Sequence, residues 1–426
     1  MISLLLCAAV SVAPVAAFDP VLDDLSQRAV KYFWEQSHPK TGLTLDRANN
    51  KEDLPRTEHV ASIAATGFAL SALAIGAERG WIERDKALQR ARATMRTLVD
   101  FPIRSRGWYL HWVDWESGNR LWKSEVSTID SGILWAGMLV AERYFKDPEI
   151  TRASDRILRE VDWEWMLTDG GAKPDSLSLT MGWHPETGFI KARWDSYNEL
   201  MLLYILALGA NERFPEKSWA DWKRPEVEYK GHKLFVGGPL FLHQMSHVFY
   251  DFSSRRDALG YDYWVGARNA TLANRQYCVD NPKGFAAYGP DVWGLSACDG
   301  PDGYNAFGAP GWISDDGTLA PAAAVASVIF TPAESLAAAR AIKAKHPETY
   351  GRYGYTTGFN PTRKWQSPDV IGIDLGQMLL AIENHRDGLP HRLSMSHPVA
   401  ERGMARAGFR KTEEGPLEKR PLRLAR

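Results

Sequence analysis

The sequence lacks the motifs of metal and nucleotide chemistry. It contains neither a Cys-x-x-Cys nor a His-Glu-x-x-His pair for a metal ion, and no Gly-Lys-Ser loop for a phosphate. The net charge is also close to zero, at −1 over 426 residues, which gives nucleic acid or an anionic membrane no electrostatic reason to bind. We therefore expect no metal, no cofactor and no nucleic-acid partner.

Cysteine is scarce, with three residues in the chain. Cys7 lies in 1–17, an apolar stretch that ends in small residues and is typical of a signal peptide. Its removal leaves Cys278 and Cys298, which an oxidising compartment could join; two buried free thiols are the alternative, and both stay open. We expect a periplasmic or secreted protein.

No hydrophobic run approaches the roughly 20 residues of a membrane span, so we expect none. Instead, helical periodicity recurs in two forms: 83–99 is apolar on one side, whereas 200–208 is apolar all round. This alternation indicates two concentric helical layers. The pattern predicts helices near 20–36, 59–78, 83–99, 128–146, 149–167, 194–209, 239–249, 256–278, 320–329, 332–346 and 370–385.

These helices predict an all-α fold, a double helical toroid of the (α/α)6 barrel type, over 18–388. Between 280 and 320 the pattern breaks into a long loop of Asn, Gly, Pro, Asp and aromatic residues, and such loops are usually functional. After 387 the chain becomes basic, and we expect 389–426 to be a solvated, partly disordered tail.

Aromatic residues are abundant, at 11% of the chain, and many stand beside Gly, Asp or His in predicted loops. An aromatic ring can stack on the apolar face of a sugar while carboxylates and amides bind its hydroxyls. Each ring taken alone is more often part of a core than of a ligand site. Their concentration in loops favours a glycan-binding cleft.

Carboxyl groups at the starts of apolar helices are the candidate catalytic residues, because cleaving a glycosidic bond needs a proton donor and usually a second carboxylate. Glu199 opens the most apolar helix, where burial would raise its pKa. Asp130, with Glu125 just upstream, starts another apolar helix, and Asp374 lies among apolar residues in the last one. An ordinary helix-terminal acid is the alternative for each.

Several segments carry a resemblance that covers most of the chain in order. They are Ser62–Gly67, Tyr197–Met201, Pro239–His247, Trp293–Tyr304, Asp316–Pro321 and Gly372–Gly376. Together they resemble the bacterial glucoamylase-like family that includes the endo-β-1,2-glucanases (glycoside hydrolase family 144). The resemblance implies an (α/α)6 barrel, export to the periplasm and metal-independent hydrolysis of β-1,2-glucan to sophoro-oligosaccharides, with inversion at the anomeric carbon.

The resemblance also implies roles for single residues. Glu199 matches the acid of a Tyr-Asn-Glu motif, thought to act through a substrate hydroxyl, while Asp374 and Asp130 match two candidates for the acid that activates water. We expect a monomer that binds a β-glucan. An exo-acting or transglycosylating relative for another β-glucan and a non-catalytic glycan-binding protein remain alternatives. The predicted substrate-binding residues are Glu125, Arg193, Tyr197, His243, Gln244, Trp293, Asp302 and Tyr304.

Overall fold

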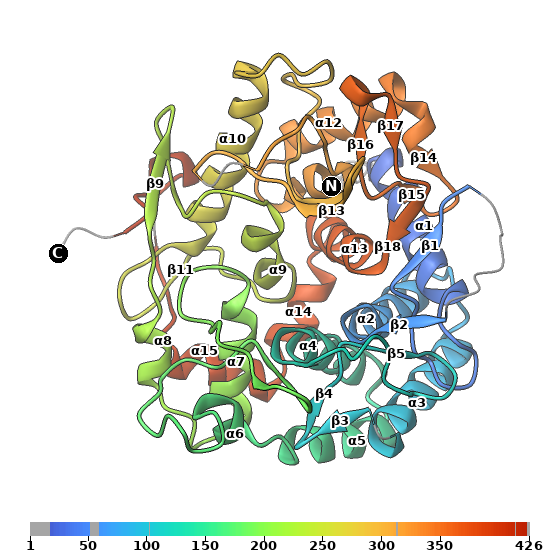
Figure 1. Ribbon diagram of the computed structural model, residues 1–426, viewed down its shortest axis with the longest axis vertical. Coiled ribbons are helices and arrows are strands. Elements are labelled where there is room, and N and C mark those ends of the chain that lie inside the picture. Colours follow the sequence, from blue (N-terminus) through green and yellow to red (C-terminus); the bar gives the residue numbers. More distant parts are fainter. Residues whose placement is uncertain (1–17, 52–58, 102, 312–313, 414, 424–426) are drawn as a thin grey trace, which may run out of the picture.

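A ring of largely apolar helices forms the centre of the molecule (Figure 1). The computed structural model describes residues 18–51, 59–101, 103–311, 314–413 and 415–423. The inner helices contact one another around the ring, with a hydrogen bond from Gln244 to the carbonyl of Ala323 joining α9 to α11. The inner helices are α2 (Ile63–Glu78), α4 (Thr128–Phe145), α7 (Leu200–Ala210), α9 (Phe241–Phe249), α11 (Pro321–Ala326) and α13 (Gly372–Arg386).

A second layer of helices surrounds this ring, and most of its members bury one side only. In α3, for example, Ala91, Met95 and Leu98 are buried and the intervening basic residues face water. The outer helices are α1 (Pro20–Glu35), α3 (Arg84–Asp100), α5 (Pro148–Arg159), α10 (Tyr263–Asp280), α12 (Pro332–Lys345) and α15 (Pro398–Arg406). Shorter helical segments are α6 (Trp163–Leu167), α8 (Lys217–Asp221), α14 (Leu389–Met395), η1 (Ser327–Ile329), η2 (Pro347–Thr349), η3 (Pro361–Arg363) and η4 (Leu417–Lys419).

This arrangement confirms the prediction of a mainly helical toroid. Most of the predicted helices are present, with ends shifted by a few residues. The one expected at 149–167 is divided into α5 and α6, the one expected from 256 begins only at Tyr263, and the one expected from 194 begins only at Leu200. Residues 195–197 are held outside the helix because Tyr197 N–H donates to the carbonyl of Lys223, and Lys223 N–H donates to that of Asp195. The candidate acid Glu199 therefore lies at the junction between this loop and α7.

Two glycines set the spacing of the neighbouring inner helices α2 and α4. A Cβ added at Gly137 would lie 1.8 Å from the backbone oxygen of Gly67, so a larger residue there would force the two helices apart. The close approach lets α4, whose side chains are buried along most of its length, pack backbone to backbone against α2.

Short antiparallel strands join the helices. The pairs are β1 (Arg47–Asn49) with β18 (Asp369–Ile371), β2 (Val60–Ser62) with β5 (Trp112–Asp114), β3 (Arg104–Ser105) with β4 (Trp108–Tyr109), β9 (Glu226–Tyr229) with β10 (His232–Phe235), β11 (Arg255–Arg256) with β19 (Arg410–Lys411), β12 (Ala297–Gly300) with β13 (Gly303–Ala306), β14 (Tyr350–Gly351) with β15 (Gly354–Tyr355) and β16 (Phe359–Asn360) with β17 (Trp365–Gln366); β6 (Val126–Ser127), β7 (Gly182–His184) and β8 (Gly188–Phe189) form one sheet.

Three of these strands lead directly into inner helices: β2 into α2, β6 into α4 and β18 into α13. Ser62 and Ser127 cap the first two helices, their hydroxyls accepting from the backbone N–H of Ala65 and Asp130. The strands thus anchor the first residues of the inner helices.

The prediction of a solvated, partly disordered tail fails for the described part of this segment, 389–413 and 415–423. Helices α14 and α15 follow directly, and α15 packs against α7 with Val399, Ala400 and Met404 buried. Further on, β19 pairs with β11 and Leu422 is buried. The segment therefore completes the outer layer over the most apolar helix.

The predicted signal peptide, 1–17, lies outside the described residues. Within the part of the chain that the structure describes, none of the helices has the length and hydropathy needed to cross a membrane.

Candidate active site

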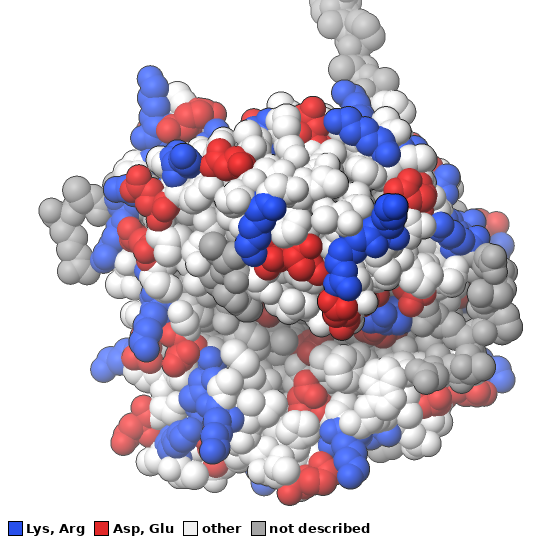
Figure 2. Space-filling view, turned by 45° about the horizontal axis from the view of Figure 1, so that its top comes forward, with Lys and Arg blue, Asp and Glu red and all other residues white. Residues whose placement is uncertain are grey.

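Three inner helices carry a carboxyl group at their N-terminal ends. Asp130 is the third residue of α4, Glu199 immediately precedes α7, and Asp374 is the third residue of α13. Asp130 is buried, whereas Glu199 and Asp374 are partly accessible. Figure 2 shows a hollow that crosses the molecule, with Asp and Glu side chains inside it.

Glu199 combines a low-polarity environment with an unused hydrogen-bonding atom. Its backbone carbonyl accepts from the Ser246 hydroxyl at 2.9 Å, and Asn198 rather than Glu199 accepts the N–H of Leu200. Glu199 Oε2 is buried and has no hydrogen-bond partner. Burial raises the pKa of Glu199 to about 7, and the nearby charge of Asp130 raises it as well. This carboxyl group keeps a proton near neutral pH and can donate it to a bound molecule.

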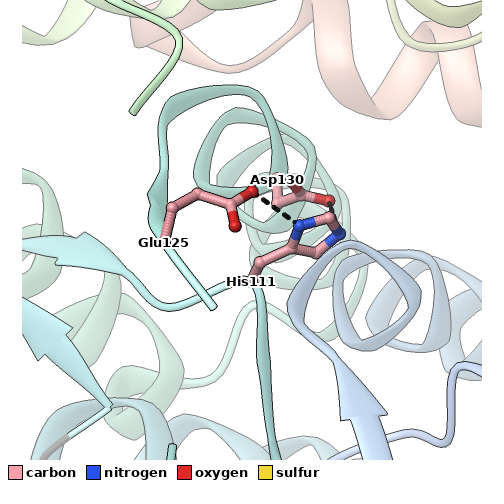
Figure 3. Close-up of side chains that lie close together, drawn as sticks. All are labelled: His111, Glu125 and Asp130. Atoms are coloured by element: carbon pink, nitrogen blue, oxygen red, sulfur yellow. Dashed lines mark hydrogen bonds and ion pairs between the residues drawn. The ribbon is translucent and has the colours of Figure 1, made fainter. Parts of the chain in front are cut away.

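His111 links two of the acids near α4 (Figure 3). Its Nδ1 lies 2.8 Å from Glu125 Oε1 and its Nε2 lies 3.6 Å from Asp130 Oδ1. Burial alone would lower the pKa of His111, but Asp130 and Glu125 outweigh it and raise that pKa above its ordinary value. Burial alone would likewise raise the pKa of Glu125, but the hydrogen bond from His111, the charge of His111 and weaker contributions together outweigh it and lower that pKa. The three groups therefore favour an imidazolium held between two carboxylates.

The same three residues could also hold a cation. Their possible ligand atoms lie within 4.8 Å of one another, and two carboxylates with one imidazole form a common donor set. A bound metal would need a deprotonated imidazole, whereas both carboxylates raise the pKa of His111. The expected absence of a metal stays a prediction.

Asp374 lies in a second group of acids. The Thr357 hydroxyl donates to Asp374 Oδ2 at 2.7 Å, and Arg47 forms an ion pair with the neighbouring Asp299 at 3.1 Å. Burial raises the pKa of Asp374 to about 7 despite the bond from Thr357, and the charges of Asp299 and Asp46 add to the rise. Asp374 also borders a small pocket whose lining includes Ser296, Ala297, Ala323 and Gln377.

Asp46 connects the two groups. Its charge contributes to raising the pKa of both His111 and Asp374, and its backbone oxygen accepts the N–H of Gly372 at the start of α13. Asp130 in turn acts on Glu199. The three candidate catalytic acids therefore belong to one electrostatic neighbourhood.

Four of the predicted substrate-binding residues pack inside the protein instead. Tyr197 and His243 are buried and their side chains contact each other, with the Tyr197 hydroxyl 3.3 Å from His243 Nδ1. Gln244 is buried and donates to Ala323 and Ser327, while Trp293 has no accessible surface. The structure gives none of these four side chains an open face for a sugar, and burial argues against their direct contact with a ligand.

The guanidinium of Arg193 is bonded to the protein. Its guanidinium donates to Asp169, to the Ser176 hydroxyl and to the carbonyls of Leu167 and Ser178. These bonds engage all its nitrogen atoms and fix the loop that follows α6. Arg193 thus supports the approach to α7 and is committed to the protein.

The remaining predicted contacts are accessible. Tyr304, on β13, is 59% exposed, and it pairs across the hairpin with Asp299 of the Asp374 group. Asp302, at the hairpin turn, is exposed and forms an ion pair with Arg363. Glu125 is half-buried beside His111. Their role in binding stays a prediction.

The two cysteines remain apart. Cys278 and Cys298 are both free and buried, which matches the second of the two expectations.

Sequence reasoning missed His111, Thr357, Asp46 and Asp299 as members of the site. The sequence shows His111 only as one of several His-Trp neighbours in predicted loops, and Thr357 carries no local signal at all. Their places depend on loops that meet at the ends of different helices, which neither spacing nor periodicity can reveal.

A helical toroid with carboxyl groups at the N-terminal ends of three inner helices, two of them with raised pKa values, suits the chemistry of a glycoside hydrolase. The family model described as "Putative glucoamylase" (Glycoamylase) matches residues 191–398. The solved structure of a "putative glucoamylase" from Bacteroides uniformis is 31% identical, covers 92% of this chain and 97% of its own, and superposes with a TM-score of 0.82. The chain therefore belongs to the bacterial glucoamylase-like family of glycoside hydrolases that includes the endo-β-1,2-glucanases (family 144).

Two further relatives have described activities. An endo-β-1,2-glucanase from Chitinophaga pinensis, solved with sophorotriose and glucose, is 26% identical over 93% of this chain and 99% of its own, with a TM-score of 0.83. An exo β-1,2-glucooligosaccharide sophorohydrolase (non-reducing end) from Parabacteroides distasonis is 28% identical over 91% of this chain. The chain spans 57% of the length of that second relative.

Proposed function

We propose that the protein hydrolyses β-1,2-glucan to sophoro-oligosaccharides. The relatives from Chitinophaga pinensis and Parabacteroides distasonis support this linkage, since both act on β-1,2-linked glucose. The chemistry rests on Glu199, whose carboxyl group has a pKa of about 7 and a buried oxygen, Oε2, without a hydrogen-bond partner. Such a group suits the transfer of a proton to a leaving sugar oxygen.

In this proposal Glu199 protonates the glycosidic oxygen, directly or through a substrate hydroxyl, as the bond from that oxygen to the anomeric carbon breaks. A water molecule attacks the anomeric carbon and gives its proton to Asp374. The anomeric configuration inverts, and one water molecule is consumed for each bond that is cleaved. Two observations favour Asp374 over Asp130 as the base. Asp374 borders a small pocket. Asp130 is already bonded to Ser127 and lies beside His111.

Asp130 then serves Glu199 electrostatically. Its charge makes ionisation of Glu199 harder, and His111 with Glu125 holds the Asp130 side chain in place. Tyr304 and Asp302 are the proposed sugar contacts near Asp374. The Tyr304 side chain is exposed to solvent and Tyr304 pairs across the hairpin with Asp299.

The architecture that presents these groups is proposed to be a closed (α/α)6 barrel. The pairing of each inner helix with an outer one supports this assignment: α2 with α3, α4 with α5, α7 with α15, α9 with α10, α11 with α12 and α13 with α1. We further propose that the protein acts as a monomer in the periplasm or outside the cell, after loss of 1–17.

Exo action is the second candidate, since the Parabacteroides distasonis relative releases sophorose from chain ends. The product pattern separates the candidates: endo cleavage of long linear β-1,2-glucan first gives a broad ladder of oligosaccharides, whereas exo cleavage gives one short product from the beginning.

The test is incubation of the purified protein with linear β-1,2-, β-1,3- and β-1,4-glucans, followed by sizing of the products. We expect products from the β-1,2-glucan only, and none from Glu199→Gln. Glu216→Gln is the matched control: Glu216 is exposed, pairs with Arg406 and lies beyond the other end of α7, so its activity should equal that of the wild type. Turnover by Glu199→Gln, or no product from any glucan, would refute the proposal.

A further inference from the structure

A tryptophan beside the His111 group is exposed to solvent. Among the described residues, the large hydrophobic side chains that are exposed are Trp122 at 63%, Tyr304 at 59% and Val279 at 39%. Val279 lies on the outer helix α10. Tyr304 pairs with Asp299 in the cluster of acids around Asp374, and Trp122 contacts Trp112 beside the cluster around His111. A single exposed hydrophobic residue is common on protein surfaces, so the surroundings of Trp122 decide its meaning.

A stack of rings connects Trp122 with the site. The His111 ring lies parallel to the Trp112 ring, with centroids 3.5 Å apart, and the Trp122 ring meets Trp112 edge to face at 5.6 Å. His111 in turn contacts Glu125 and Asp130. Trp122 therefore lies two ring contacts from His111, whose partner Asp130 acts on the pKa of Glu199.

The backbone holds Trp122 in this exposed position. Both Trp122 and Lys123 have a φ of 52°, a conformation that costs energy for residues other than glycine. Arg120 fixes the turn by donating to the carbonyls of Ser124 and Lys123, and by a two-pronged ion pair with Glu186. A turn that is strained yet fixed by so many bonds is typical of a functional position.

We propose that Trp122 is a stacking platform for a glucose unit of the substrate that lies beyond the units at the cleaved bond. This inference rests on the proposed glucan hydrolysis and extends it. The binding cleft continues on the His111 side, and stacking on Trp122 gives long glucan chains a higher affinity than short ones. The indole offers a flat apolar face with little rotamer entropy to lose, which suits the apolar face of a pyranose ring.

The test measures KM and kcat separately for linear β-1,2-glucooligosaccharides of increasing length. Trp122→Gly removes the ring and accepts the positive φ, so folding is retained. We expect its KM to rise about tenfold for long chains, with kcat and the KM of the shortest cleaved substrate unchanged. Trp122→Tyr should restore most of the affinity, and Val279→Ala is the control for loss of an exposed hydrophobic residue.

Equal KM values for wild type and Trp122→Gly at every length overturn the platform, as does a fall in kcat at all lengths, which indicates a structural effect through Trp112. If the wild type cleaves no β-1,2-glucan, the proposed function fails on its own, and retention of each glucan in affinity electrophoresis then tests the platform. Weaker retention of Trp122→Gly supports it; equal retention, or no retention of any glucan by the wild type, refutes it.

Discussion

The pH dependence of hydrolysis should report the charge of Asp130. At pH 7 a Glu199 with a pKa of about 7 is protonated in half of the molecules. With its ordinary pKa of 4.5, it would be protonated in about one molecule in 300. Its environment therefore supplies more than about a hundredfold in the population of the proton donor. We predict that kcat/KM falls with rising pH as Glu199 ionises near pH 7.

The opposite limb should belong to Asp374, which must lose its proton to act as the base and also has a pKa of about 7. If the two groups titrate independently, about a quarter of the molecules carry the active combination at pH 7. The expected profile is therefore a narrow bell centred near neutral pH.

Asp130→Asn removes a negative charge that raises the pKa of Glu199, so the alkaline limb should move to lower pH. The measurement is the initial rate on linear β-1,2-glucan between pH 4 and 9 at substrate concentrations well below KM. Glu216→Gln, which removes a remote exposed carboxylate, should leave the limb in place. An alkaline limb that stays put or moves upward in Asp130→Asn would show that Asp130 does not control the acid.

Three further outcomes are expected. Folded Glu199 keeps its proton up to about pH 7, whereas the unfolded residue loses it near pH 4.5, so the wild type loses stability as the pH rises between these values. Relative to the wild type, Glu199→Gln should therefore gain up to about 3 kcal/mol in the free energy of unfolding at pH 8 and little at pH 4. Urea unfolding at the two pH values measures this difference. Gly403→Ala should lower stability by about 1 to 3 kcal/mol, seen as a lower Tm, because its Cβ would lie 2.1 Å from the Ile205 backbone oxygen where α15 crosses α7. A thiol reagent should leave Cys278 and Cys298 unmodified in the native protein and label both in denaturant, because burial raises both thiol pKa values; rapid native labelling would contradict their burial.

The sequence predicts the helical layers well because burial on all sides leaves a strong signal. The run from Leu200 to Leu208 is apolar at every position, and it lies at the centre of the ring. The sequence pattern places the start of this helix six residues too early, because the contact of Tyr197 with Lys223 is made by a distant segment. Tertiary contacts of this kind leave no trace in local periodicity.

The tail shows how charge density misleads. Basic residues after 387 favour a solvated segment, yet Val399, Ala400 and Met404 form one apolar face of a short helix. Pro398 at its first position and His397 as its N-cap were local signals for that helix. The helix α15 has only nine residues. Its apolar face can be interpreted only together with α7, the helix that it covers.

For the site, the sequence identifies the acids but not their surroundings. Glu199, Asp130 and Asp374 stand out as acids at the starts of apolar helices, and the structure brings them into one electrostatic neighbourhood. The same reasoning assigned Tyr197 and Trp293 to the cleft, although both are buried. A motif shared by a family contains residues that pack as well as residues that react, and only their accessibility separates the two.

Two physical effects compete at these acids, and their magnitudes decide the chemistry. A helix N-terminus favours a negative charge by roughly 0.3 to 1 kcal/mol, which would lower the pKa of Glu199 and Asp374. A pKa of about 7 for Glu199 instead corresponds to about 3 kcal/mol against the charged form, so loss of hydration outweighs the helix. The packing that orders the inner helices therefore also raises the pKa of Glu199, on which its proposed role as the proton donor depends.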